Sequence, residues 1–406
     1  MNRSFDAPGT TPAHDDFALA NRATPLTPVI AAEIAERGPM TFARFMSLAL
    51  GHPEHGYYSR PDLAWGAAGD FETSPEVHPV FGYLWARQIL ECWERLGRPA
   101  EFALVEPGAG SGAFAVAILT WLRERAPECA AAARPVILDG HPRRVEHQRA
   151  RLRARGLEAK HALLEEWLAR DEHVTGVVIS NELFDALPVH LVERREGALH
   201  EWYVAAGADG AFVLEPGPTS TADLEAHFER LRIWPGEECR AEVSLAAPQL
   251  MRALAGRLER GYVLTIDYGY EAELLYASWR RMGTLMAFRH HSPQPDPLAL
   301  PGLTDLTAHV DFTSLAGAGA EAGFEPAPLV SQAEALMALG IGEALEAARA
   351  RAAEDFAAFA SARRAAETLL DPAGLGRIRV LAMAKGAPLE GLACLRSPEG
   401  YRAASR

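Results

Sequence analysis

Apolar, β-branched strand segments alternate with helical segments along the middle of this 406-residue chain. This alternation constrains the fold more than any other feature, because strands separated by helices form βαβ units with a parallel sheet. Right-handed crossovers then place helices on both faces of that sheet. We therefore predict an α/β fold with a doubly wound, Rossmann-like core. Its strands are expected within 101–114 and at 134–140, 161–167, 176–183 and 261–269, with helices at 114–125 and 142–155.

Segments outside this core show other periodicities. Residues 27–50 predict two short amphipathic helices. Residues 189–215 alternate apolar and polar side chains around turn residues, which predicts antiparallel strands. Residues 270–312 are expected to be loop-like, and Ala-rich helices at 331–370 precede a last strand at 377–386.

Composition limits the function classes. No apolar run approaches the roughly 18 residues needed to cross a bilayer, and the N-terminus has no apolar signal-peptide region. The formal net charge is −14 and the only lysines are Lys160 and Lys385, so nucleic acid is not expected as a partner. The dispersed cysteines, without a CxxC pair, favour a reducing cytoplasm and argue against a metal site.

A glycine-rich turn, VEPGAGSGA, joins the first core strand to the following helix. Gly108, Gly110 and Gly112 accept positive φ and let a ligand lie against the backbone. Together with Ala113, the first two also satisfy the dinucleotide fingerprint, so the glycine spacing alone leaves a nicotinamide cofactor open. The longer pattern VExGxGxG, in which Glu106 precedes the first glycine by two residues, is similar to the first motif of S-adenosylmethionine-dependent methyltransferases. Their donor brings a carboxylate and an ammonium to this turn.

Two acids follow the next strands of the predicted sheet. Asp139 ends the second strand, where either cofactor would present ribose hydroxyls to a carboxylate. A helix N-cap is the alternative role for this side chain. Glu165, after the third strand, is expected in a loop that contacts adenine, with the start of a solvated helix as the alternative.

Polar residues also follow the strand at 176–183, in the stretch VVISNELFDALPVH. Because ligands of open α/β sheets bind outside the carboxyl ends of the strands, this stretch is expected to form the floor of a site. Glu182 and Asp185 can clamp a guanidinium by charge-assisted hydrogen bonds. A helix cap at Asn181 or Asp185 is the alternative.

The stretches LTIDYGY and DLTAHVDF supply further candidates. Asp267 and Tyr268 end another core strand, so they are expected either beside the site or in a structural capping role. His309 is expected to be a packed loop histidine, with a place near the acceptor as the alternative.

Several separated stretches resemble one family. They are GPMTFARFMSLALGHPEHGYYS, GDFETSPEVHPVFG, LVEPGAGSG, ISNELFDALPVH, LTIDYGY, GTLMAFRHH, DLTAHVDFTSL, SQAEALMALGI and LLDPAGLG. In this order, from about Gly38 to Gly386, they are similar to the MidA-like methyltransferases. These are bacterial relatives of a mitochondrial complex I assembly factor that acts as a protein arginine methyltransferase.

The resemblance implies a class I methyltransferase core with an N-terminal helical cap and S-adenosylmethionine as donor. It implies a protein partner as acceptor, an arginine of a respiratory complex I subunit or of its assembly. It implies a cap loop that closes on the donor, and it places in that loop Gly69, Asp70, Phe71, Thr73, Pro75 and Glu76. It assigns to the donor turn Glu106, Gly108, Gly110 and Gly112, and to the acceptor-facing loop Asn181, Glu182 and Asp185.

The chain also departs from the family pattern. The family usually has Pro and Arg where this chain has Ala109 and Ser111, and Ala where it has Ser74. Because the backbone amides of the turn bind the donor, donor binding is expected to tolerate these changes. They leave the identity of the acceptor open.

The expected organisation has six parts. They are a disordered tail (1–25), a helical cap with the donor-closing loop (26–98), the first half of the core (99–188), an inserted antiparallel β and helical substrate region (189–255), the second half of the core with a helical insertion (256–390) and a C-terminal tail (391–406). The sequence does not fix an oligomeric state.

Three other functions compete with a protein methyltransferase. A nicotinamide-dependent oxidoreductase needs a hydride-site constellation such as YxxxK, and neither lysine follows a tyrosine at that spacing. A small-molecule methyltransferase is equally compatible with the donor motif, although the long insertions favour a large acceptor. A non-catalytic assembly protein that keeps the fold is the third alternative.

Overall fold

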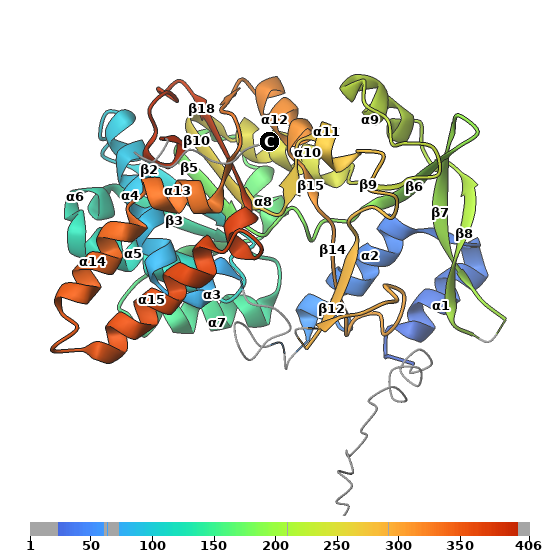
Figure 1. The fold of residues 1–406 in the computed structure, drawn as a ribbon, viewed down its shortest axis with the longest axis horizontal. Coiled ribbons are helices and arrows are strands. Elements are labelled where there is room, and N and C mark those ends of the chain that lie inside the picture. Colours follow the sequence, from blue (N-terminus) through green and yellow to red (C-terminus); the bar gives the residue numbers. More distant parts are fainter. Residues whose placement is uncertain (1–22, 61–62, 64–72, 209, 291, 397–406) are drawn as a thin grey trace, which may run out of the picture.

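The computed structural model describes residues 23–60, 63, 73–208, 210–290 and 292–396, and Figure 1 shows their arrangement. Its central sheet consists of β2 (Phe102–Pro107), β3 (Ala133–Leu138), β4 (Lys160–Ala162), β5 (Val174–Asn181), β10 (Leu258–Asp267), β16 (Glu325–Pro326), β17 (Val330–Ser331) and β18 (Arg379–Lys385). The strand order is β16-β18-β10-β5-β2-β3-β4, with β17 also paired to β18. The strands from β4 to β10 are parallel, and β18 is antiparallel to β10.

Helices cover both faces of this sheet because alternate side chains of each strand point to opposite faces. Leu104 and Val177 belong to a buried cluster with α4, α5, α13 and α15, whereas Val105 and Val178 pack with α8, α10 and α12. The doubly wound α/β fold is therefore confirmed. The helices of the core are α4 (Val80–Arg95), α5 (Ala113–Arg125), α6 (Pro127–Ala132), α7 (Pro142–Arg153), α8 (Leu164–Leu168), α10 (Ala246–Gly256), α12 (Phe312–Glu321), α13 (Gln332–Ala338), α14 (Ile341–Ala350) and α15 (Phe356–Leu370), with short 3₁₀ turns at Leu375–Arg377 and Ala393–Leu395.

The third predicted strand, 161–167, is mostly wrong. Strand β4 ends at Ala162, and helix α8 begins two residues later, at Leu164. Leu164 and Trp167, three residues apart, lie on one face of that helix and pack against the sheet, while Glu165 and Glu166 stay exposed. A stretch this short carries either pattern, so packing decided between strand and helix.

The predicted antiparallel strands at 189–215 are confirmed. They form a second sheet of order β1-β7-β6-β9, with β8 paired to β7. Its strands are β1 (Met40–Thr41), β6 (His190–Arg195), β7 (Ala198–Ala206), β8 (Phe212–Pro218) and β9 (Arg240–Val243), and α9 (Asp223–Leu231) packs beside them. Glu196 and Gly197 both have positive φ between β6 and β7, as a two-residue hairpin turn requires.

The segment 270–312 is more ordered than the predicted loop. It contains α11 (Ala272–Leu275), β11 (Gly269–Tyr270), β12 (Met286–Arg289), β13 (Ser292–Pro293), β14 (Asp305–Thr307) and β15 (Val310–Asp311). Strand β12 pairs with both β13 and β14, and β11 pairs with β15. These strands are too short to show a period in the sequence, so only their pairing partners define them.

Both predicted N-terminal helices are confirmed, as α1 (Thr27–Arg37) and α2 (Phe42–Gly51), followed by the 3₁₀ turn η1 (Tyr57–Ser59). They lie beside the second sheet (Figure 1). There β1 pairs with β7, and apolar side chains of both helices pack with Trp202 and Val204. Helix α4 instead packs on α5, with the rings of Phe81 and Phe114 5.2 Å apart. Among the described helices, none is long and apolar enough to cross a membrane.

A substitution at Gly176 tests how closely strands β5 and β2 approach each other. A Cβ atom there would lie 2.1 Å from the carbonyl oxygen of Ala103, a backbone atom that cannot turn away. We expect Gly176→Ala to lower the free energy of unfolding by about 3 kcal/mol, as overpacking in a core does. Denaturant unfolding measures this. Gly256→Ala is the matched control, because its Cβ would meet nothing within 4 Å; equal loss in both variants would contradict the proposed close contact.

Candidate functional site

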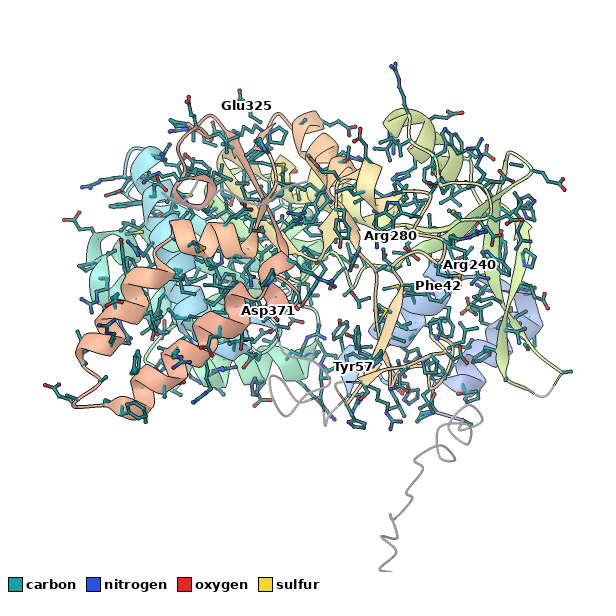
Figure 2. The ribbon with its side chains drawn as sticks, in the orientation of Figure 1. Phe42, Tyr57, Arg240, Arg280, Glu325 and Asp371 are labelled. Carbon is teal, nitrogen blue, oxygen red and sulfur yellow. The ribbon has the colours of Figure 1, made fainter. Side chains whose placement is uncertain are left out.

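A cavity of about 940 Å³ lies at the carboxyl edge of the parallel strands. Parallel pairing brings the ends of β2, β3, β5 and β10 to this one edge, where α/β sheets bind ligands. Asp371, after α15, lines the cavity from the core, whereas Arg280 lines it from the inserted segment (Figure 2). The wall between them comes from α2, η1, α3 (Ser74–Val77) and β12.

The glycine turn after β2 has the backbone that its sequence predicts. Gly108, Gly110 and Gly112 have φ of 69°, 51° and 81°, a region that other residues rarely adopt. Gln148 of α7 donates a hydrogen bond to the Gly110 carbonyl at 2.9 Å, which holds the turn against the helix. The first two glycines line the cavity, so a ligand can lie against their backbone.

Glu106 is the penultimate residue of β2 and lines this cavity. Burial raises the pKa of its carboxyl to about 8, with a backbone hydrogen bond from Ala115 acting in the opposite direction. Its Oε2 atom is buried without a hydrogen-bond partner. A buried carboxylate oxygen of this kind needs a donor, and an ammonium group is the partner that best favours its charged form. The Glu106 carboxyl and the glycine turn therefore fit the amino-acid end of S-adenosylmethionine.

The cap loop reaches the same turn through Glu76 of α3. Glu76 contacts the hydroxyl of Ser111 and forms an ion pair with Arg151 of α7 at 3.1 Å. Arg151 also donates to the Ser111 hydroxyl at 2.6 Å. Thr73 and Pro75 line the cavity beside Glu76. The other predicted cap-loop residues, Gly69, Asp70 and Phe71, lie outside the described residues.

The two acids predicted to contact the ribose and the adenine differ in position. Asp139 lines the cavity, but its buried carboxylate forms an ion pair with Arg144 at 2.7 Å and accepts the backbone amide of His141 at 3.0 Å. It thus organises the start of α7 in addition to facing the cavity. Glu165 is exposed in the first turn of α8 and is not among the residues that line the cavity.

The NELFDALP stretch forms a turn and loop rather than a helix, so the helix-cap alternative is wrong. Glu182 has φ of 49°, in the left-handed region. The Glu182 Oε1 atom accepts hydrogen bonds from Asn181 Nδ2 at 2.7 Å and from the Ser74 amide at 3.3 Å, which leaves Oε2 for a ligand. Asp267 stabilises the loop by accepting the amides of Leu183 and Phe184 at 3.0 and 2.8 Å.

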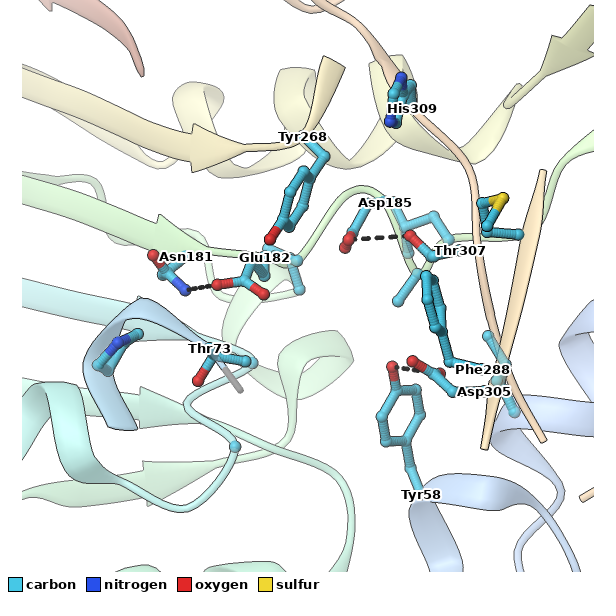
Figure 3. A pocket seen from close by; sticks show the side chains of 18 of the residues that line it. Tyr58, Thr73, Asn181, Glu182, Asp185, Tyr268, Phe288, Asp305, Thr307 and His309 are labelled. Carbon is cyan, nitrogen blue, oxygen red and sulfur yellow. Dashed lines mark hydrogen bonds between the residues drawn. The ribbon is translucent and has the colours of Figure 1, made fainter. Parts of the chain in front are cut away.

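The three predicted acceptor-facing residues come together in the cavity wall. Asn181, Glu182 and Asp185 all line the cavity, and Figure 3 shows the two carboxyl groups pointing into it. Burial raises the pKa of Glu182 to about 8, with repulsion from Asp185 as the next cause. Burial likewise raises the pKa of Asp185 to about 6, against a hydrogen bond of 3.0 Å from Thr307. A cation between the two carboxyls would restore their charged forms.

A third carboxyl in this wall was missed at the sequence level. Asp305 of β14 lines the cavity and accepts a hydrogen bond from the Tyr58 hydroxyl at 3.3 Å (Figure 3). The segment 270–312 carries no periodicity that separates Asp305 from surface acids, and only the β12–β14 pairing brings it inward. Both residues lie in stretches that resemble the family, Asp305 in DLTAHVDFTSL and Tyr58 in GPMTFARFMSLALGHPEHGYYS, and that resemblance was the available signal.

Aromatic side chains complete the acceptor side. Tyr268, Phe288 and His309 line the cavity with Tyr58. The rings of Tyr268 and His309 are nearly parallel, with centroids 6.4 Å apart. Burial lowers the pKa of His309 to about 4, so the ring is neutral at physiological pH. His309 thus both packs, as predicted, and faces the acceptor region.

Comparison with known proteins agrees with this geometry. Residues 84–330 match a family described as "Putative S-adenosyl-L-methionine-dependent methyltransferase". The fold and the donor turn thus define an S-adenosylmethionine-dependent methyltransferase. The chain belongs to this family, and the resemblance to MidA-like methyltransferases is confirmed.

Solved and curated relatives extend the match. A superfamily member from Burkholderia thailandensis, crystallised with bound S-adenosyl-homocysteine, is 32% identical with a TM-score of 0.81 over 97% of this chain and 98% of that one. The protein arginine methyltransferase NDUFAF7 homolog of Drosophila melanogaster is 33% identical over 69% of this chain and 67% of its own length. The human mitochondrial protein arginine methyltransferase NDUFAF7 is 28% identical over 73% and 69%. S-adenosylmethionine is therefore the methyl donor that this protein uses.

Glu106 gives a test of the donor site. Glu106→Gln keeps the size of the side chain but removes the charge that pairs with the donor ammonium. We expect the affinity for S-adenosylhomocysteine to fall by about tenfold, in the range of a lost charge-assisted hydrogen bond. Titration calorimetry measures it. Glu165→Gln, on the exposed face of α8, is the control; an unchanged affinity in Glu106→Gln would exclude this pairing.

Proposed function

We propose that this methyltransferase transfers the donor methyl group to the guanidinium of a protein arginine. The observation that carries the proposal is the group of three carboxyls, Glu182, Asp185 and Asp305, in one cavity wall with aromatic rings beside them. Carboxylates bind a guanidinium by paired, charge-assisted hydrogen bonds, and aromatic faces accept its flat surface. The related Drosophila and human proteins, which are named protein arginine methyltransferases, support the same acceptor.

The side chains of this site mainly position the acceptor. Bound S-adenosylmethionine supplies an electrophilic methyl group on a sulfonium. Asn181 and the Ser74 amide fix the Glu182 Oε1 atom, so Oε2 is free to accept an N–H of the guanidinium. Asp185, held by Thr307, accepts a second N–H and aims one nitrogen toward the donor. Glu182, which is a carboxylate when the guanidinium is bound, can take the proton that the methylated nitrogen releases.

The proposal extends to the acceptor protein and to the compartment. We propose a subunit of respiratory complex I, or a protein of its assembly, as the acceptor, and a cytoplasmic location. The first rests on the family resemblance and the second on cysteine usage. Assays with separately purified complex I subunits, followed by mass spectrometry of arginine peptides, test the acceptor. Cell fractionation tests the location.

The competing functions predict other results in the same assay. We would supply tritiated S-adenosylmethionine with arginine-containing protein substrates and with copies in which the arginines are lysines. Transfer to arginine alone supports the proposal. Transfer to small molecules but to no protein favours a small-molecule methyltransferase, and donor binding without any transfer favours a non-catalytic assembly protein.

Glu182 gives the sharpest mutational test of the clamp. Glu182→Ala removes the carboxyl that holds the acceptor, so we expect turnover to fall by at least ~10²-fold because orientation is lost. Donor affinity should stay nearly the same, since Glu182 is placed on the acceptor side. Steady-state kinetics and calorimetry measure the two effects. Unchanged turnover on a confirmed protein substrate would rule out the clamp.

The pH dependence follows from the raised pKa of Glu182. Below about 8 the carboxyl of the free enzyme is protonated and neutral, and above it the carboxylate can bind the guanidinium. The kcat/KM for the acceptor should therefore rise with pH and level off at or below about 8, since the positive sulfonium favours the carboxylate. Glu182→Gln should remove this rise from the pH–rate profile. The same rise in the variant would assign it to another group.

A further inference from the structure

A short stretch beside the cavity exposes several large apolar side chains. Its members are Leu274 (45% exposed), Trp279 (68%), Met282 (71%) and Met286 (41%), which we call the mouth platform. Single exposed apolar residues are ordinary on a protein surface, but a group drawn from thirteen consecutive positions is not. Such grouped exposure marks a surface that another molecule covers.

The backbone of this stretch is held firmly, so the exposure does not come from a loose loop. The Arg240 amide of β9 donates to the Arg281 carbonyl at 2.9 Å. The buried Glu242 carboxylate accepts the amides of Thr284 and Leu285 at 2.8 and 3.2 Å. The platform is therefore preorganised, which lowers the entropic cost of binding.

The mouth platform is continuous with the active-site cavity. Arg280 and Met286 line the cavity as well as lying within this stretch. The Arg280 guanidinium lies over the rings of both Trp279 and Tyr270, at 4.6 and 4.8 Å from their centres. Figure 2 shows Arg280 between the core and the second sheet, on the side where Arg240 lies. A side chain that enters the cavity past Arg280 thus brings its own chain against the platform.

We propose that the mouth platform docks the segment of the acceptor protein that flanks the modified arginine, an inference that rests on the proposed function. The charges are complementary: the cavity offers carboxyls to the arginine side chain, while Arg280 offers N–H donors to a backbone carbonyl of the same segment. A small-molecule acceptor would fill the cavity without needing an apolar surface outside it. Trp279, exposed and stacked on a guanidinium, is the type of residue that contributes most to such interfaces.

The length of an extended chain sets the spacing that we expect in the partner segment. An extended chain advances about 3.3–3.6 Å per residue, so a residue two to four positions from the arginine lies about 7–14 Å along the chain. The proposal therefore expects an apolar side chain within about two to four residues of the arginine, on a segment that extends from the cavity onto the platform. The apolar residue sets affinity, and the carboxyls of the cavity select the arginine.

The test uses two fluorescent peptides with the full-length protein saturated with S-adenosylhomocysteine. One peptide carries a central arginine with leucines two and four residues to either side, and the other has serines at those positions. Anisotropy titrations compare the wild type with the double variant Trp279→Ala, Met282→Ser. We expect the wild type to bind the leucine peptide at least about tenfold more tightly than the serine peptide, and the double variant to lose most of that difference.

Phe356→Ala is the matched control, because Phe356 is 70% exposed on α15, away from the platform. It should keep the full preference for the leucine peptide. The double variant is judged to be folded if its melting temperature and its affinity for S-adenosylhomocysteine equal those of the wild type. If the double variant does not fold, the single variant Trp279→Ser takes its place in the titrations.

Three results would overturn the proposal. The first is that the wild type binds both peptides equally, or binds neither. The second is that the double variant keeps the preference for the leucine peptide. The third is that the wild type sediments as a dimer and the double variant as a monomer. The last result would assign the platform to a second copy of the chain. Methyl transfer is scored separately with tritiated donor. A peptide that binds through the platform without being methylated counts against the proposed function and leaves the docking surface established.

Discussion

The acceptor side of the site depends on the buried carboxylate of Asp267. It ends β10 and accepts the amides of Leu183 and Phe184, so the loop after β5 is attached to the neighbouring strand. These bonds stabilise the chain next to Glu182, whose left-handed φ costs on the order of 1–3 kcal/mol when it is not otherwise supported. The hydrogen bonds and the parallel pairing of β5 with β10 together direct Glu182 and Asp185 into the cavity.

This arrangement places several carboxyl groups in a small volume. Burial raises the pKa of Glu182, Asp185 and Asp267, and repulsion from Asp185 raises the pKa of Glu182 and Asp267 further. Active sites commonly keep such unfavourable electrostatics, because the strain is relieved when a ligand of opposite charge binds. The donor side shows the same principle on a smaller scale, since Glu106 is buried with one carboxyl oxygen unpartnered. The cavity is thus preorganised for cations at both ends.

The N-terminal helices and the insertions form one wall of the site. Helices α1 and α2 pack on the second sheet, and that cluster includes Leu306 of the β12–β14 segment. Two arginines of α7 connect this wall to the core: Arg144 binds both Asp139 and the Tyr58 carbonyl, and Arg151 binds Glu76. A change in the donor site can therefore reach the cap directly through α7.

The sequence by itself determined the doubly wound core, the donor turn and the acidic loop after β5, because strand alternation, glycine spacing and polar residues at strand ends are local patterns. It failed at 161–167 and 270–312, where the elements are too short to show a period. Glu165 lies outside the cavity wall for the same reason, since α8 replaced the predicted strand. Only the tertiary structure brought Asp305 into the same cavity wall as Glu182 and joined the platform to the cavity. Those contacts depend on the pairing of β12 with β14 and on hydrogen bonds from β9 to residues 281–285, and no local pattern in the sequence marks them.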